Sequence, residues 1–157
     1  MATPGWLARD GFGPAEEARI VAAIREAESR TSGEIRVRIE RACPGDPLET
    51  ARRRFASLRM NRTAERNGVL LFLSSTDRKL AVVGDEGIHA HVGAEFWSGL
   101  LDRLAARLRA GEAGAGVEEA VLAVGAKLAE RFPPVPGDVN ELPDAISTDE
   151  DGAPGSP

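Results

Sequence analysis

The fold is decided by residues 67–83, which read NGVLLFLSSTDRKLAVV. Five unbroken apolar residues, Val69–Leu73, lie between turn signals, a pattern typical of a central strand buried on both faces. A short polar connection, Ser75–Arg78, leads to a second apolar strand at Leu80–Val83. Because four connecting residues allow no crossover, we predict that these two strands pair in the antiparallel sense.

The flanking segments supply one more strand and four helices. Residues 34–41 alternate apolar and polar side chains, which predicts a half-buried strand. It should run parallel to the strand at 69–73, because a helix capped by Asp46 and opened by Pro47 lies between them. Further helices are predicted from Pro14 to a stop at Ser32-Gly33, over 96–108 and over 117–132, with a glycine-rich break at 111–116. A small mixed sheet with helices on both faces follows.

The chain has the size and composition of one domain. It has 157 residues, 42% of them apolar, which is enough for a real core. We divide it into a flexible N-terminus at 1–13, a folded domain at 14–147 and a disordered acidic tail at 148–157. Near the end of the domain, Val139, Leu142 and Ile146 are expected to hold an extended strap against the core, because Pro143 excludes a helix interior.

The charge distribution limits the classes of partner. The net charge is −5, and residues 138–157 hold six of the 25 acidic residues, which leaves 19 acidic and 20 basic residues in 1–137. The nearly equal numbers of acidic and basic residues in 1–137 argue against nucleic-acid binding, which needs a basic surface. No apolar run approaches the roughly 18 residues of a membrane span, and Met1–Asp10 has no signal-peptide pattern. We therefore expect a cytoplasmic monomer that binds neither nucleic acid nor membrane.

Familiar catalytic motifs are missing from the sequence. The single cysteine, Cys43, has Glu49 six positions later, where a cysteine phosphatase needs Arg, so a partly buried, inert thiol is favoured. There is no phosphate-binding glycine loop and no Gly-x-Ser-x-Gly nucleophile elbow. His89 and His91 lie one residue apart, so in a helical turn their side chains should diverge instead of sharing a metal.

Acidic and amide side chains gather where the predicted topology brings strand ends together. The starts of the predicted strands at 34–41 and 69–73 and the end of the strand at 80–83 share one sheet edge, which places Glu34, Asn67, Asp85 and Glu86 there, and Glu95 could join them from the next helix. Such oxygen ligands suit Ca²⁺ or Mg²⁺. Crowded carboxylates of this kind should repel one another. The alternative is that these are solvated turn residues and helix caps.

Several stretches together resemble the TPM domain family. They are Thr31-Ser-Gly-Glu-Ile-Arg-Val, Arg66-Asn-Gly-Val-Leu-Leu-Phe, Asp77-Arg-Lys, Gly84-Asp-Glu-Gly-Ile and Glu95-Phe-Trp, and the likeness covers about residues 12–147. The family is named for a thylakoid-lumen protein, a photosystem II repair protein and a receptor modulator. The segment at 138–144 resembles a short soluble bacterial branch without a membrane anchor. The resemblance implies a three-layer α/β/α sandwich, divalent-cation binding, chiefly Ca²⁺, and a possible acid phosphatase activity.

Three functional hypotheses follow. The first is a cation-binding or protein-interaction module without robust catalysis. The alternative is a metal-dependent phosphatase acting on phosphate monoesters, in which Asp85, Glu86 or Glu95 holds the metal, Asn67 orients the substrate and His89 protonates the leaving group. The third is an adaptor that binds a protein partner through its acidic tail.

Overall fold

The order of the helices and strands predicted from the sequence is confirmed, and the structure adds a 3₁₀ turn, a short helix and a fourth strand. The computed structural model describes residues 6–135 and 146–148. The elements in chain order are α1 (Pro14–Glu28), β1 (Glu34–Glu40), α2 (Pro47–Ser57), the 3₁₀ turn η1 (Met60–Arg62), β2 (Gly68–Ser74), β3 (Lys79–Gly84), α3 (Glu86–His89), α4 (Ala94–Arg109), α5 (Ala113–Arg131) and β4 (Ile146–Thr148).

The sheet has four strands in the order β3-β2-β1-β4. β1 and β2 are parallel, with Glu34 opposite Gly68, and β2 and β3 are antiparallel, with Val69 opposite Gly84, as predicted. β2 is buried along its whole length, because helices cover both of its faces. The fourth strand, β4, is parallel to β1, with Ile146 opposite Val37.

β4 replaces part of the predicted strap. Ile146 is in this strand and packs against the main core, whereas Val139 and Leu142 lie outside the described residues. Strand pairing continues to Thr148, one residue beyond the predicted domain boundary. A three-residue strand gives no alternation that a sequence pattern can detect, so its pairing with β1 was not anticipated.

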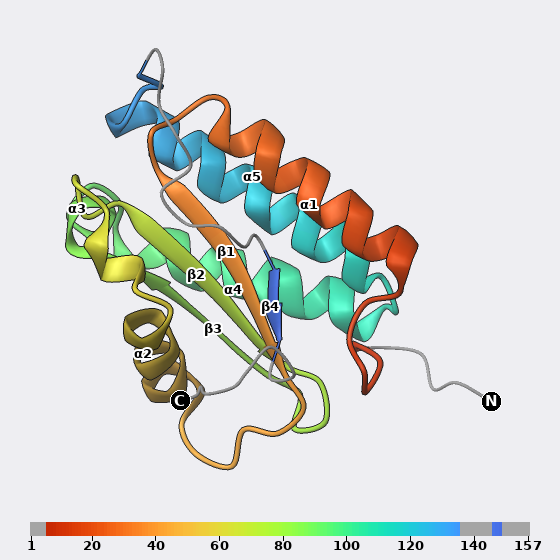
Figure 1. The fold of residues 1–157 in the computed structure, drawn as a ribbon. Helices are drawn as coiled ribbons and strands as arrows, with labels where there is room; N and C mark the ends of the chain where they lie inside the picture. The colour runs from red at the N-terminus through yellow and green to blue at the C-terminus, as the bar shows by residue number, and fades with distance from the viewer. Residues whose placement is uncertain (1–5, 136–145, 149–157) are drawn as a thin grey trace.

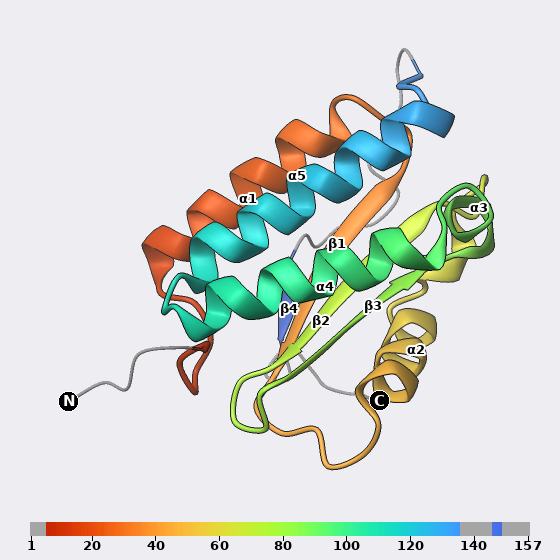
Figure 2. The same ribbon diagram turned by 180° about the vertical axis from the view of Figure 1, so that it is seen from behind.

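Helices cover both faces of the sheet, which makes the predicted three-layer sandwich. In Figure 1, α1 and α5 lie side by side on one face and α2 lies on the other; Figure 2 shows α4 crossing the same face as α5. The larger core lies between the sheet and α1, α4 and α5, around Val37, Leu71 and Leu104. Two smaller clusters, around Phe72 and Leu70, bury the α2 face.

Close packing explains two glycines that the sequence assigns to helix ends. α1 ends at Glu28, well before Gly33, and Gly33 does not adopt a left-handed conformation. A Cβ at Gly33 would instead approach Leu128 to 2.8 Å. The predicted break at 111–116 is also wrong in extent, because α5 already begins at Ala113. Gly116 lies inside α5, where a Cβ would approach Cβ of Arg107 in α4 to 2.7 Å.

The described part of the N-terminus packs against the domain. Leu7 is buried in the main core, and the backbone N–H of Trp6 donates to the carbonyl of Leu108 near the end of α4. The segment assigned by sequence to a flexible N-terminus therefore contributes apolar side chains to the core from residue 6 onward. Among the described residues, no helix has the length and apolar character needed to cross a membrane.

Candidate functional site

Two features stand out at the surface of this fold, and the first is the predicted acidic edge of the sheet. The register brings the start of β1, the start of β2 and the end of β3 to the same edge, because Glu34 lies opposite Gly68 and Val69 lies opposite Gly84. The N–H of Asp85 donates to the carbonyl of Gly68 at 2.9 Å, which continues the pairing one residue past β3. The topological part of the prediction is confirmed.

The loop before β2 is tightly attached to α3. Arg66 adopts a left-handed conformation with φ 54°, and the N–H of Asn67 donates to Oγ1 of Thr63 at 3.1 Å. The N–H of Gly87 in α3 donates to the carbonyl of Arg66 at 2.8 Å. A Cβ at Gly87 would lie only 2.4 Å from the carbonyl oxygen of Glu65. Only glycine permits this approach, which fixes α3 over the loop.

Asp85 is the central carboxylate of the edge, and it is paired. Only 7% of the residue is exposed, and its side chain accepts from Arg66 twice, with Nε–Oδ2 at 2.8 Å and Nη2–Oδ1 at 3.0 Å. It also accepts from the N–H of Glu86 at 2.8 Å and so caps α3. The hydrogen bond to Asp85 raises the pKa of the Arg66 guanidinium above its ordinary value. Asp85 thus has the capping role that the sequence offered as the alternative.

Asn67 is the least satisfied polar residue of the edge. It is 1% exposed, and its Nδ2 donates to Oγ of Ser32 at 3.3 Å. Its Oδ1 is buried and has no hydrogen-bond partner among the described residues. A buried amide oxygen without a partner is costly, since it has lost its hydration without compensation. Glu34, whose own N–H donates to the carbonyl of Asn67, is also buried.

The two remaining predicted ligands, Glu86 and Glu95, are exposed to solvent. Glu86 has a side chain that is 76% exposed and approaches Nη2 of Arg66 at 3.3 Å, and Glu95 is exposed in the first turn of α4. Within residues 6–135 and 146–148, no group of three or more His, Cys, Asp or Glu side chains is arranged to hold a metal ion. The described residues of the edge therefore supply oxygen atoms but do not form a preorganised metal coordination site.

The histidines diverge, as predicted. His91 Nε2 lies 3.0 Å from a carboxylate oxygen of Glu130 in α5, and this hydrogen bond lowers the pKa of Glu130. His89, at the end of α3, instead lines a pocket beside β3. Cys43 is 1% exposed, with its Sγ 3.6 Å from both the Gly45 carbonyl oxygen and Thr50 Oγ1, so the residue is more deeply buried than the partly buried thiol predicted from the sequence.

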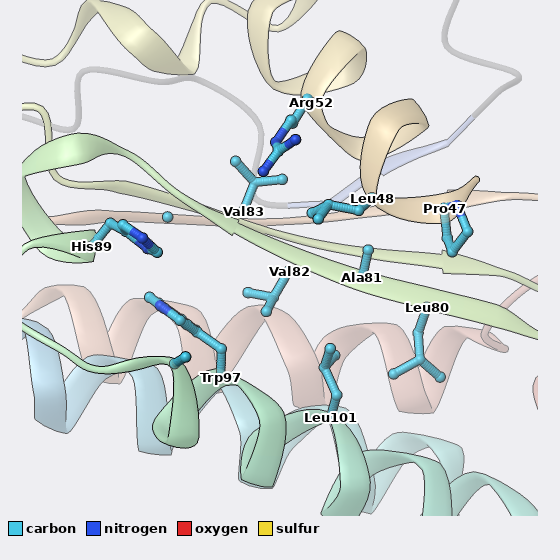
Figure 3. A pocket seen from close by; sticks show the side chains of 12 residues that line it. Pro47, Leu48, Arg52, Leu80, Ala81, Val82, Val83, His89, Trp97 and Leu101 are labelled. Atoms are coloured by element: carbon cyan, nitrogen blue, oxygen red, sulfur yellow. The ribbon is translucent and has the colours of Figure 1, made fainter.

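The second surface feature is this pocket, which sequence reasoning missed. It has a volume of about 360 Å³ and runs along β3 between α2 and α4 (Figure 3). Its lining is mostly apolar and is formed by Pro47, Leu48, Arg52, Leu80, Ala81, Val82, Val83, Gly84, His89, Ala94, Trp97 and Leu101. One large apolar residue of the lining, Leu48 in the first turn of α2, is 37% exposed.

The fold and its surfaces define a small three-layer α/β domain with a four-stranded mixed sheet. A family model described as the TPM domain matches residues 9–127, and the chain belongs to this family. It is similar to the BA42 protein of the psychrophilic bacterium Bizionia argentinensis, with 35% identity and a TM-score of 0.80 over 87% of this chain and 94% of BA42.

Two more distant structures share the fold. The N-terminal domain of a protein from P. gingivalis has 21% identity and a TM-score of 0.60, over 79% of this chain and 82% of that domain. The N-terminal domain of the cg2496 protein of Corynebacterium glutamicum has 12% identity and a TM-score of 0.59, over 93% and 87%. None of the curated proteins compared with the chain matches it.

Proposed function

We propose that this TPM-domain protein is a divalent-cation binding module without robust catalysis, and that Ca²⁺ binds at the acidic edge. The observation that carries the proposal is the buried Oδ1 of Asn67, which has no partner among the described residues. A hard cation would supply the positive partner that this oxygen lacks. Glu34, Asp85, Glu86 and, from α4, Glu95 are the carboxylates proposed to complete the ligand set.

Arg66 governs how such a cation would bind. Its guanidinium already neutralises Asp85, so a cation must compete with it for the same carboxylate. The Arg66 side chain is 44% exposed and can turn into solvent, whereas the Asp85 side chain is 6% exposed and stays in place. Binding is therefore expected to be coupled to release of Arg66, which weakens the affinity and makes it sensitive to the charge at position 66.

Thermal unfolding with and without Ca²⁺ tests the proposal. At about 100 times its dissociation constant, a ligand that binds only the folded state adds about 2.7 kcal/mol to the free energy of unfolding. For a domain of this size, this corresponds to a rise in melting temperature of about 5–10 °C. Asp85→Asn should reduce the rise, and Arg66→Gln should shift half-saturation to lower Ca²⁺ because it removes the competing charge.

A matched control is Asp102→Asn, which removes an exposed carboxylate from α4 away from the predicted ligands. This variant should keep the full response to Ca²⁺. If neither millimolar Ca²⁺ nor Mg²⁺ moves the melting curve, the proposal is refuted. An equal loss of response in Asp102→Asn and Asp85→Asn would show that Ca²⁺ acts on overall charge instead of at the edge.

The phosphatase alternative finds less support in the geometry. Its proposed proton donor, His89, lines the apolar pocket beside β3, and Cys43 is buried. A panel of phosphate monoesters, assayed with Mg²⁺, Mn²⁺ and Ca²⁺, distinguishes the two functions. Metal-dependent turnover that disappears in Asp85→Asn and persists in Asp102→Asn would replace the binding module by an enzyme.

A further inference from the structure

β3 is an edge strand whose outer side has no strand beside it in the described part of the chain. In an antiparallel pair, backbone groups point alternately toward and away from the neighbouring strand. The N–H of Asp85 donates toward β2, to the carbonyl of Gly68. By this alternation, the backbone groups of Leu80, Val82 and Gly84 point outward, away from β2.

The outer side of β3 forms the floor of the pocket between α2 and α4. In Figure 3, Ala81 and Val83 extend from β3 toward α2, and Leu80 and Val82 extend toward α4. Leu48 and Arg52 form the α2 wall, and Trp97 and Leu101 form the α4 wall. An extended chain lying on this floor would present alternate side chains to the two walls, as β3 itself does.

One residue that lines the pocket, Trp97, has a buried hydrogen-bond donor without an acceptor in the described part of the chain. Trp97 is 9% exposed, and its buried Nε1–H has no hydrogen-bond partner among the described residues. Gly84 allows the indole to lie against β3, since a Cβ there would approach Cζ2 of Trp97 to 2.8 Å. A carbonyl or carboxylate oxygen entering the pocket would satisfy the indole N–H.

The edge also lacks the usual protection against pairing. Proteins commonly protect an exposed edge strand with a proline, a bulge or a lysine. β3 reads KLAVVG, and its single lysine, Lys79, donates to the carbonyls of Cys43 at 2.8 Å and Gly45 at 2.9 Å. The Lys79 ammonium group therefore binds the loop before α2 and does not protect the β3 edge from pairing with another strand.

The charge around the pocket indicates the chemistry of a partner. Arg52 is the one Lys, Arg, Asp or Glu residue in the lining, and it is exposed and makes no ion pair with the described residues. The helix that forms this wall, α2, holds three arginines and one glutamate, a net charge of +2. A neighbouring chain with acidic side chains on this side would be electrostatically complementary.

We propose that the pocket along the free edge of β3 binds an extended acidic segment of a partner protein, which adds a fifth strand to the sheet. The segment pairs with the outward backbone groups of Leu80, Val82 and Gly84. Its apolar side chains face Trp97 and Leu101, and its acidic side chains face Arg52. This proposal does not depend on the proposed cation site, although Gly84 and Ala94 of the lining are the chain neighbours of Asp85 and Glu95.

The probe is an eight-residue peptide that alternates Val and Glu, titrated into ¹⁵N-labelled protein. We expect saturable shifts of the amides of Leu80, Val82 and Gly84, together with a downfield shift of the Trp97 indole N–H. A peptide that alternates Val and Lys should bind at least about tenfold more weakly, because like charges placed together disfavour the complex. Arg52→Glu should reverse this preference.

Two controls separate strand pairing from general attraction. Arg53→Glu changes the neighbouring exposed arginine, which pairs with Glu49 and does not line the pocket, and should keep the preference for the Glu peptide. A Val/Glu peptide N-methylated on alternate residues along one edge should lose binding, since it cannot donate to the strand.

Three results would overturn the proposal. The first is the absence of saturable shifts up to the solubility limit of the Val/Glu peptide. The second is equal binding of the Val/Glu and Val/Lys peptides. The third is a dimer in sedimentation equilibrium whose Leu80, Val82 and Gly84 amides are already protected from exchange, because a second copy would then occupy the edge.

Discussion

Gly87→Ala tests whether α3 is held over the loop before β2 as described. The new Cβ would lie 2.4 Å from the carbonyl oxygen of Glu65 and 2.6 Å from that of Arg66, so backbone must move apart. Overpacking of this kind costs about 1–3 kcal/mol. The movement would also weaken the bond from the Gly87 N–H to Arg66, worth about 1 kcal/mol, and the better helix propensity of Ala offsets about 1 kcal/mol.

The net loss should be about 2 kcal/mol, which lowers the melting temperature by about 4–8 °C. Thermal unfolding followed by circular dichroism measures it. Gly45→Ala is the matched control, because nothing lies within 4 Å of a Cβ there and φ is not left-handed. It should leave stability unchanged or raise it by up to about 1 kcal/mol. Equal melting temperatures for Gly87→Ala and the wild type would refute the close contact between α3 and the loop.

Two further predictions concern ion pairs. Glu40→Gln should lower the free energy of unfolding in urea by about 2 kcal/mol or more, because the Glu40 side chain is 7% exposed and binds Arg54. Glu49→Gln is the control: this carboxylate is 72% exposed, so its loss should change the free energy of unfolding by less than about 0.5 kcal/mol. The pKa of Glu130 should lie below its ordinary value of 4.5, because its carboxylate accepts a hydrogen bond from His91. The contribution of this carboxylate to stability is therefore present above pH 4.5 and is lost as the pH falls through the folded-state pKa. Carboxyl NMR should show the pKa of Glu130 return toward 4.5 in His91→Ala.

The elements that were predicted from the sequence are those whose signals are local. β2 is recognised because five consecutive apolar residues need burial on both faces, and α2 is recognised because Asp46 accepts from the N–H of Glu49 and caps it, as the pattern requires. The antiparallel hairpin follows from the short connection between β2 and β3. These constraints act within a few residues, so the sequence alone contains them.

Features that depend on distant partners were missed. β4 exists because three residues near the end of the chain meet β1, more than a hundred positions away. Gly116 is needed where α5 touches α4, not where the chain turns. The pocket beside β3 arises from the spacing of two helices that belong to different parts of the chain, and no motif in either helix encodes it.

The strand ends that form the acidic edge lie together as predicted, but the charge interactions there differ from the expectation. The expectation of repelling carboxylates is wrong for Asp85, because Arg66 reaches it with two hydrogen bonds. The sequence shows Arg66 beside Asn67 but does not reveal that a left-handed residue turns its side chain toward the end of β3.

This pairing changes what a calcium experiment can show. A cation that takes Asp85 from Arg66 removes an interaction that stabilises the free protein, so the stabilisation measured is the cation's gain less that loss. The rise of about 5–10 °C expected at saturation already refers to the net affinity, since linkage uses the measured dissociation constant. The intrinsic affinity of the edge should therefore appear in Arg66→Gln, where no guanidinium has to leave. If that variant bound Ca²⁺ no more tightly than the wild type, Arg66 would not occupy the cation's place, and Asp85 would not be a ligand.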